Sequence, residues 1–142
     1  MSGQTRYLFD TNLVSETRKP KPDPGAFAFL QATEPNSVFL SVLTLGELRK
    51  GVAALKLRDP DPNAASRLAA WIEGIEVSYT DRILGIDLAT ARLWGEWSAE
   101  RPRPVVDTLL AATAVVNNLT LVTRNIRDVR DTPVKLLDPW TG

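Results

Sequence analysis

Four acidic residues stand where a carboxylate can take part in chemistry. Asp10 follows an apolar segment, Glu47 lies in the first turns of an expected helix, Asp107 opens a long apolar stretch, and Asp128 follows another apolar segment. Carboxylates that share one crevice repel one another unless a proton or a cation compensates their charge. Mg²⁺ and Mn²⁺ bind through oxygen ligands alone, and such a metal activates water for in-line displacement at phosphorus. The four acids therefore suggest metal-dependent hydrolysis of a phosphate ester.

Each acid taken alone also has a purely structural interpretation. Asp10 suits an Asx turn or a helix N-cap, and Asp107 suits an N-cap as well. Thr44 and Glu47 have the spacing of a T-x-x-E capping box. Asp128 is explained by ion pairs with neighbouring arginines in its polar loop. These alternatives stay open until the acids are placed relative to one another.

The composition excludes several other kinds of enzyme. The chain of 142 residues has no histidine and no cysteine. This rules out a Ser-His-Asp triad, a histidine base, a thiolate nucleophile and a zinc site built from imidazole or thiolate. Any catalysis must use carboxylates, hydroxyls, Lys, Arg, Tyr or a metal bound through oxygen.

Length, charge and hydropathy indicate one ordinary globular domain over residues 1–142. Lys and Arg number 17 and Asp and Glu number 17, so bulk charge does not favour coating of nucleic acid. The absence of cysteine is compatible with the reducing cytoplasm, and no apolar run approaches the ~18 residues of a membrane span. We therefore expect a cytoplasmic protein without a membrane anchor.

The elements that must position the acids alternate between strand and helix. Apolar periodicity and Pro or Asn breaks predict strands over 6–9, 37–42, 83–86, 119–123 and 134–137, and helices over 13–19, 25–33, 45–55, 68–75, 88–98 and 109–116. Such alternation predicts a three-layer α/β/α sandwich around a parallel sheet of about five short strands. Ligands of such sheets bind beyond the carboxyl ends of the strands, where all four acids are expected.

Four ordered segments carry a resemblance to a known family. They are Tyr7-Leu8-Phe9-Asp10-Thr11-Asn12-Leu13-Val14-Ser15-Glu16, Ser41-Val42-Leu43-Thr44-Leu45-Gly46-Glu47-Leu48 with Lys50-Gly51, Val106-Asp107-Thr108-Leu109-Leu110-Ala111-Ala112-Thr113-Ala114, and Leu121-Val122-Thr123-Arg124-Asn125. With these segments the chain resembles the PIN-domain ribonucleases, in particular the VapC/FitB-like toxins of bacterial toxin–antitoxin pairs. The similarity runs from about Arg6 to Trp140.

The resemblance implies a Mg²⁺- or Mn²⁺-dependent endoribonuclease with a defined set of acids. Asp10 and Asp107 match the principal metal ligands, and Glu47 completes the cluster or positions water. Many relatives carry a fourth acid where this chain has the neutral Asn125, and Asp128 is then expected to supply the missing charge.

The same resemblance extends to supporting residues and partners. Thr11 and Thr123 are expected to hydrogen-bond the carboxylates or a metal-bound water. Arg101, Arg103 and Arg124 are expected to contact RNA phosphates near the acids. The family further implies a homodimer and a cognate antitoxin that joins it in a hetero-oligomer.

Two other functions remain open from the sequence. A phosphatase of the haloacid-dehalogenase type also places an aspartate after its first strand, but it needs a second aspartate two residues later, where this chain has Asn12. A non-catalytic domain that binds RNA or a partner protein through the same crevice is favoured by the neutral Asn125. The ribonuclease is the better supported of the three.

Overall fold

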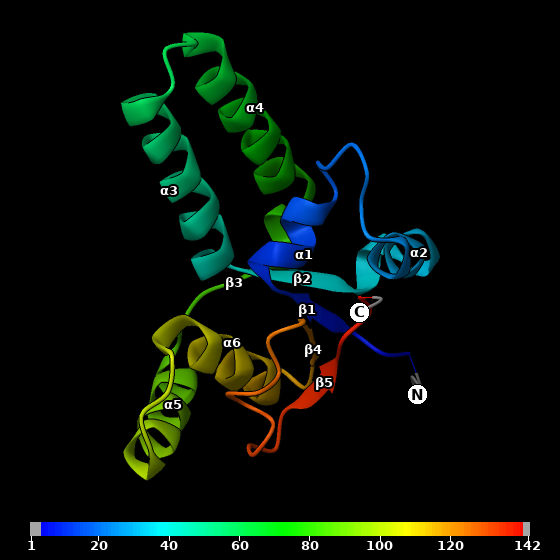
Figure 1. Cartoon of the computed structure of the whole chain (residues 1–142). Coiled ribbons are helices and arrows are strands. Elements are labelled where there is room, and N and C mark those ends of the chain that lie inside the picture. Colours follow the sequence, from blue (N-terminus) through cyan, green and yellow to red (C-terminus); the bar gives the residue numbers. More distant parts are fainter. Residues whose placement is uncertain (1–3, 141–142) are drawn as a thin grey trace.

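The computed structural model describes residues 4–140 and is built around a parallel sheet of five strands (Figure 1). Its strands are β1 (Tyr7–Phe9), β2 (Val38–Ser41), β3 (Ile83–Leu84), β4 (Thr120–Val122) and β5 (Lys135–Leu137), in the spatial order β3-β2-β1-β4-β5. The chain adds β2 and β3 on one side of β1 and then returns to add β4 and β5 on the other. Beyond the carboxyl ends of β1 and β4 lies the switch point, where such sheets bind ligands.

Helices cover both faces of this sheet. One face carries α1 (Thr11–Glu16), α2 (Pro24–Ala32), α3 (Val42–Arg58) and α4 (Pro62–Ser78), and the other carries α5 (Leu88–Glu100) and α6 (Val105–Val116). The short 3₁₀ turns η1 (Pro35–Ser37) and η2 (Thr80–Arg82) lead into β2 and β3. In Figure 1, α3 and α4 form an antiparallel hairpin that extends away from the sheet. The predicted three-layer α/β/α sandwich is confirmed.

Alternation along the central strands divides the core into two clusters. Leu8 and Leu121 pack with α5 and α6, whereas their neighbours Phe9 and Val122 pack with α1, α2, α3 and α4. All four side chains are buried. Because successive residues of a strand point to opposite faces, the three-residue strands anchor both helical layers and hold their carboxyl ends in a fixed relation.

Turn and capping residues set where the helices begin and end. The side chains of Asp23, Asp61 and Asp87 cap α2, α4 and α5 by accepting backbone N–H groups of the first turn. After α6 the chain turns at Asn118, whose φ of 56° is a left-handed conformation that asparagine tolerates better than most residues. No helix within residues 4–140 is both long enough and apolar enough to cross a membrane.

Candidate active site

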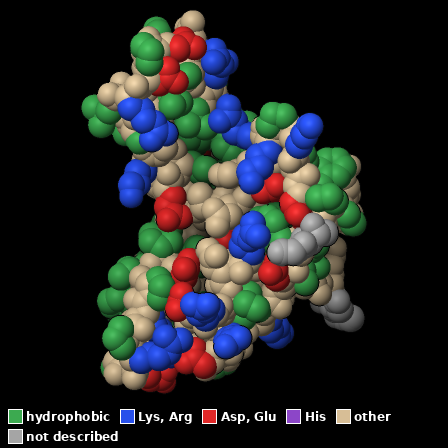
Figure 2. Space-filling model, viewed as in Figure 1, with side chains coloured by type: hydrophobic (Ala, Val, Ile, Leu, Met, Phe, Trp, Pro, Cys, Tyr) green, Lys and Arg blue, Asp and Glu red, His purple; other side chains and the backbone are tan. Residues whose placement is uncertain are grey.

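A cavity of about 270 Å³ opens beyond the carboxyl ends of β1 and β4, where α1, α3, α6 and the segment after β4 meet. Three predicted acids from three different elements line it, with one lysine and several polar groups. The lining residues are Asp10, Thr11, Asn12, Glu47, Lys50, Asp107, Leu110 and Asn125. Figure 2 shows acidic side chains at the waist of the molecule, between the α3–α4 hairpin and the layer of α5 and α6.

Asp10 is fixed by hydrogen bonds to both of its carboxylate oxygens. Oδ1 accepts the backbone N–H of Leu13 at 2.9 Å, and Oδ2 accepts the hydroxyl of Thr123 at 2.6 Å. The side chain is only 5% exposed, and this burial raises the pKa of Asp10 even though both hydrogen bonds lower it. The structural and functional interpretations of Asp10 therefore hold together: it caps α1 and also faces the cavity.

Thr123 connects Asp10 to the segment that follows β4. Its hydroxyl oxygen accepts the backbone N–H of Asn125 at 3.0 Å while its hydroxyl hydrogen is donated to Asp10. The backbone of Asn125 thus fixes the orientation of the Thr123 hydroxyl, which in turn fixes the carboxylate. A hydrogen bond from Thr123 to a carboxylate was expected, and its role in a functional site stays a prediction.

Glu47 reaches the cavity from the second turn of α3 and is held by Thr11. The Thr11 hydroxyl donates to Oε1 of Glu47. The alternative T-x-x-E capping box is not formed, because α3 begins at Val42 and Ser41 is its N-cap, accepting the N–H of Leu43 at 3.0 Å. The side chain of Glu47 is therefore directed to the site rather than to its own helix end.

Asp107 lies in the first turn of α6. The N-cap of this helix is Pro104, so Asp107 is not the N-cap that its sequence position also allowed. Burial raises the pKa of Asp107, and the negative charges of Asp128 and Glu47 raise it further. Asp128 does not line the cavity, yet its charge acts on Asp107. The structure thus brings Asp10, Glu47 and Asp107 to one cavity, whereas Asp128 acts on Asp107 through its charge from outside the cavity lining.

The donors around the cavity fit a hard divalent cation better than any other group. They are carboxylate, hydroxyl and amide oxygens, and Asp107 and Glu47 both raise the pKa of Asp10 through their negative charge, so the acids repel one another. Within residues 4–140, no three acidic side chains are arranged to hold one metal ion as they stand. A hard divalent cation that keeps several waters needs only one or two carboxylates, and the residues of the cavity lining fit such an ion.

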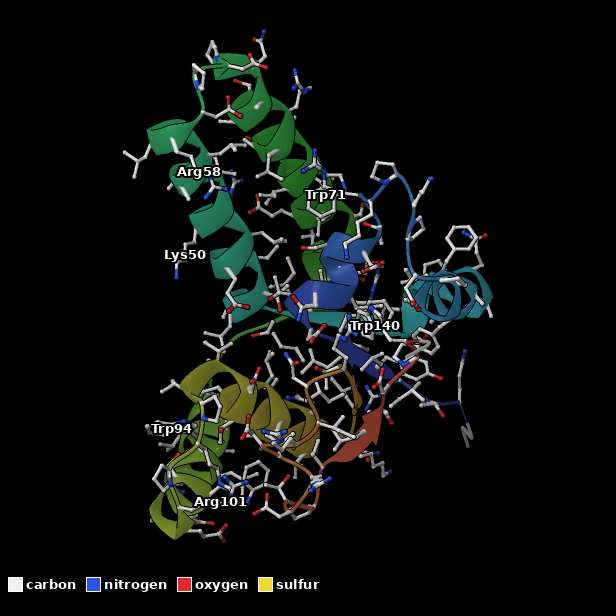
Figure 3. The ribbon with its side chains drawn as sticks, in the orientation of Figure 1. Lys50, Arg58, Trp71, Trp94, Arg101 and Trp140 are labelled. Atoms are coloured by element: carbon white, nitrogen blue, oxygen red, sulfur yellow. The ribbon has the colours of Figure 1, made fainter. Side chains whose placement is uncertain are left out.

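Sequence reasoning missed Lys50, the cation among the residues that line the cavity. Lys50 follows Glu47 by three residues on α3, and residues at this spacing share one side of a helix. Figure 3 shows it projecting from the side of α3 that faces away from α4. The i, i+3 spacing from a predicted catalytic acid is the signal that identifies it.

The arginines predicted to contact RNA already have partners inside the protein. Arg101 and Arg103 bind Asp131 and the backbone carbonyl of Asp128. The guanidinium of Arg124 lies over the ring of Trp140, 5.3 Å from its centroid. Contact of these three arginines with RNA stays a prediction.

The chain resembles known proteins over nearly its whole length. Toxin FitB of Neisseria gonorrhoeae is 30% identical over 138 residues, which cover 94% of this chain and 97% of FitB. VapC ribonuclease Y4jK of Sinorhizobium fredii is 27% identical over 139 residues, 94% of this chain and 96% of that protein. The solved structure of FitAB bound to an IR36 DNA fragment matches with a TM-score of 0.83 at 27% identity, covering 95% of this chain and 96% of the FitAB chain. The PIN domain family itself matches residues 7–134, and the chain therefore belongs to the PIN-domain family.

Proposed function

We propose that this chain is the ribonuclease toxin of a toxin–antitoxin pair and that it hydrolyses RNA phosphodiester bonds at the acid-lined cavity with Mg²⁺ or Mn²⁺. The proposal is carried by the meeting of Asp10, Glu47 and Asp107, from three separate elements, in one cavity at the switch point of the sheet. Relatives named as ribonucleases or toxins, matched over 94% of this chain, support it. The proposal includes one domain over residues 1–142, acting in the cytoplasm.

In this proposal Asp10 and Asp107 hold the metal ion. When bound, the ion supplies Lewis-acid stabilisation of the phosphate charge and acidifies a water molecule. Asp10 needs no rearrangement to keep its orientation, because Leu13 and Thr123 fix both of its oxygens and each oxygen retains a further lone pair. Asp128 adds negative charge beside Asp107, and the neutral Asn125 contributes through its backbone.

Glu47 acts on the attacking water. Its Oε1 is engaged by the Thr11 hydroxyl, and we assign Oε2 to orient the water and accept its proton. In a chain without histidine, a carboxylate of the cavity lining is a base available to this water.

Lys50 binds the scissile phosphate in the same proposal. Its ammonium group is the positive charge that the cavity lining offers to a phosphate entering among three acids. We assign Arg124 to extend this contact along the RNA backbone, because it lies two residues after β4 and next to Asn125. Arg101 and Arg103 contribute less, since their donors are engaged inside the protein.

A cognate antitoxin and a second copy of this chain are the proposed protein partners. The FitAB and FitAcB structures, at 27% and 28% identity, support a partnered toxin. Sedimentation of the chain alone and with its antitoxin tests both contacts.

The test is cleavage of total bacterial RNA by antitoxin-free protein, with Mg²⁺ or Mn²⁺ compared against EDTA and new 5′ ends mapped. Discrete metal-dependent cuts are expected, and they should vanish in Asp10→Asn. Glu73→Gln is a matched control, because it neutralises an exposed acid on α4 outside the cavity. Cuts that persist in Asp10→Asn, or that survive EDTA, would contradict the proposal.

The alternative with support in the structure is a non-catalytic domain that binds RNA or a partner protein. Within the described part of the chain no three acids are arranged to hold one ion, and Asn125 is neutral where the family resemblance leads us to expect an acid. Equal toxicity of wild type and Asp10→Asn in cells would favour this alternative, because binding should survive the loss of a metal ligand. The phosphatase is disfavoured by Asn12, and only a covalent phosphate trapped on Asp10 would revive it.

A further inference from the structure

Arg101, Arg103 and Asp131 form an ion-pair cluster outside the lining of the acid-lined cavity, which we call the arginine clamp. The two arginines lie in the link between α5 and α6, and Asp131 lies in the loop after β4. Asp131 Oδ1 accepts Arg103 Nη1 at 2.9 Å and Arg101 Nη2 at 3.2 Å, and Oδ2 accepts Arg103 Nη2 at 3.1 Å and Arg101 Nε at 3.2 Å. One carboxylate is thus held by two guanidinium groups, each through two donors.

Both guanidinium groups also donate hydrogen bonds to the backbone of Asp128. The carbonyl oxygen of Asp128 accepts Arg101 Nη2 at 3.0 Å and Arg103 Nη1 at 3.0 Å. A carbonyl with two charged donors in fixed positions cannot rotate without breaking both hydrogen bonds. The clamp therefore fixes the backbone of Asp128 against the link that leads into α6, the helix of Asp107.

Arg103 has no donor left for any other task. Besides Asp131 and Asp128 it binds the carbonyl of Trp97 through Nε at 2.9 Å and Oε1 of Glu100 through Nη2 at 2.8 Å. These contacts use all five N–H groups of a guanidinium, and the side chain is 0% exposed. Arg103 is therefore an anchor between the end of α5 and the loop that carries Asp128.

The same link is joined rigidly to Asp107. Pro104 follows Arg103 directly, and its carbonyl accepts both the backbone N–H of Thr108 at 3.1 Å and the Thr108 hydroxyl at 2.6 Å. Thr108 is buried and follows Asp107 in α6. One short stretch of chain thus ties the loop of Asp128 to the helix turn of Asp107.

We infer that the arginine clamp positions Asp128 against Asp107 and thereby sets the affinity of the cavity for its divalent cation. Arg101, Arg103 and Asp131 act through Asp128 and are positioning residues, so this inference rests on the proposed function. A lysine cannot replace either arginine fully, because an ammonium group lacks the planar fork that reaches Asp131 and the Asp128 carbonyl together.

Mn²⁺ binding to the full chain, measured by calorimetry, tests the inference in four proteins: wild type, Arg101→Ala, Asp128→Asn and the double variant. Arg101 is suited to this because its side chain is 39% exposed, so its removal leaves Arg103 and the core in place. We expect Arg101→Ala to weaken Mn²⁺ binding about 10-fold, the lower end of what residues supporting metal ligands contribute. In the Asp128→Asn background the same change should have almost no effect, because the clamp then has no charge to position.

Arg92→Ala is the control, since it removes an exposed arginine of α5 without touching the clamp. Asp131→Asn, which keeps the side-chain shape, should weaken Mn²⁺ binding in the same direction as Arg101→Ala. Unchanged affinity in both clamp variants would overturn the inference. So would an equal loss in the wild-type and Asp128→Asn backgrounds, which would indicate general loosening of the loop.

Failure of the inference and failure of the proposed function give different results. If wild type binds Mn²⁺ and cleaves RNA while the clamp variants match it, the positioning role is wrong and the ribonuclease stands. If wild type neither binds Mn²⁺ nor cleaves RNA, both the proposed function and the inference that rests on it are wrong. Melting temperatures of all variants, recorded in EDTA, show whether each protein is folded when it is measured.

Discussion

The acid-lined cavity includes Asp107 of the first turn of α6, and the arginine clamp includes the link just before that helix, yet their carboxylates have opposite environments. In the cavity, burial raises the pKa of Asp10 and of Asp107, and neighbouring acids add to the effect. In the clamp, hydrogen bonds from Arg103 and Arg101 hold the pKa of Asp131 well below its ordinary value of 3.8. Arginines stand four and six residues before Asp107, yet they are directed to Asp131.

This difference indicates where the fold keeps negative charge without a partner. A chain with equal numbers of acidic and basic residues has enough cations to pair every acid. The clamp pairs one carboxylate with two arginines, whereas the described lining of the cavity contains three acids and one lysine. Carboxylates held together without compensation cost stability, and the proposed divalent cation would compensate their charge.

Neutralising Asp10 in the cavity should have the largest effect on RNA cleavage. Asp10→Asn is expected to reduce RNA cleavage on the order of 10³-fold, because a metal ion supplies several kcal/mol of charge stabilisation in the transition state. Its melting temperature in EDTA should stay equal or rise, because asparagine keeps an acceptor for Leu13 and removes an unfavourable buried charge. A matching loss of stability and activity would mean that Asp10 is only a helix cap.

Removing Arg103 from the clamp should lower the melting temperature, whereas Asp10→Asn should lower activity and leave the melting temperature equal or higher. Arg103→Ala removes all five hydrogen bonds of a fully buried guanidinium and leaves Asp131 and the Asp128 carbonyl without it, so the melting temperature should fall by several degrees. Arg103→Lys, which keeps the charge but not the fork, should recover part of this loss. An unchanged melting temperature in Arg103→Ala, followed by circular dichroism, would contradict the anchoring role.

Placement of the acids along the chain was predictable, because it follows from chain order alone. In a parallel sheet every strand ends at the same edge, so residues that follow strands or open the next helices converge there. Asp10, Glu47 and Asp107 meet this condition, and the cavity contains all three. The capping-box alternative for Glu47 failed because α3 starts three residues before the apolar stripe that suggested it, which makes Ser41 the cap.

The partners of Arg101 and Arg103 were not predictable from the sequence. Asp131 lies 28 residues beyond Arg103, and nothing in the local pattern indicates that the loop after β4 folds back onto the link before α6. Two arginines near a predicted acid are equally compatible with RNA binding and with ion pairs inside the protein. Lys50 was missed for a related reason: its chemistry depends on which side of α3 faces the cavity, and Glu47 alone identifies that side.

Lys50 offers a smaller and more specific test of the cavity. Lys50→Ala should lower kcat/KM for RNA about 10-fold, the loss expected for one charged hydrogen bond to phosphate. The loss should shrink in high salt, where exposed charges are screened, and Lys50→Arg should restore most of the activity. Lys56→Ala, an exposed lysine in the last turn of α3, is the control. Equal losses in Lys50→Ala and Lys56→Ala would show that only bulk charge matters.

The two regions should also respond to pH in opposite directions, with the smallest effect of the series. For Asp10 and Asp107 the folded pKa is raised, so their contribution to stability is greatest below pH 3.8 and is lost as pH rises through the folded pKa. For Asp131 the folded pKa is lowered, so its contribution is complete above pH 3.8 and is lost as pH falls below that value.

Thermal melts in EDTA from pH 3 to pH 8 resolve the two responses, because carboxylates ordinarily titrate at roughly pH 3–5 and the series extends above that range. Any stability advantage of Asp10→Asn over wild type should grow as pH rises. The deficit of Asp131→Asn should disappear as the solution is acidified. The same pH dependence in both variants would contradict the contrast between the cavity and the clamp.

The most direct measurement is the melting temperature of wild type, Asp10→Asn and Asp131→Asn at neutral pH, with and without saturating Mg²⁺ or Mn²⁺. A cation that binds only the folded protein raises the melting temperature in proportion to its occupancy. We expect the metal to stabilise wild type clearly, Asp131→Asn to a lesser degree, and Asp10→Asn hardly at all. Equal stabilisation of wild type and Asp10→Asn, or none in wild type, would contradict a cation site built on the acids of the cavity.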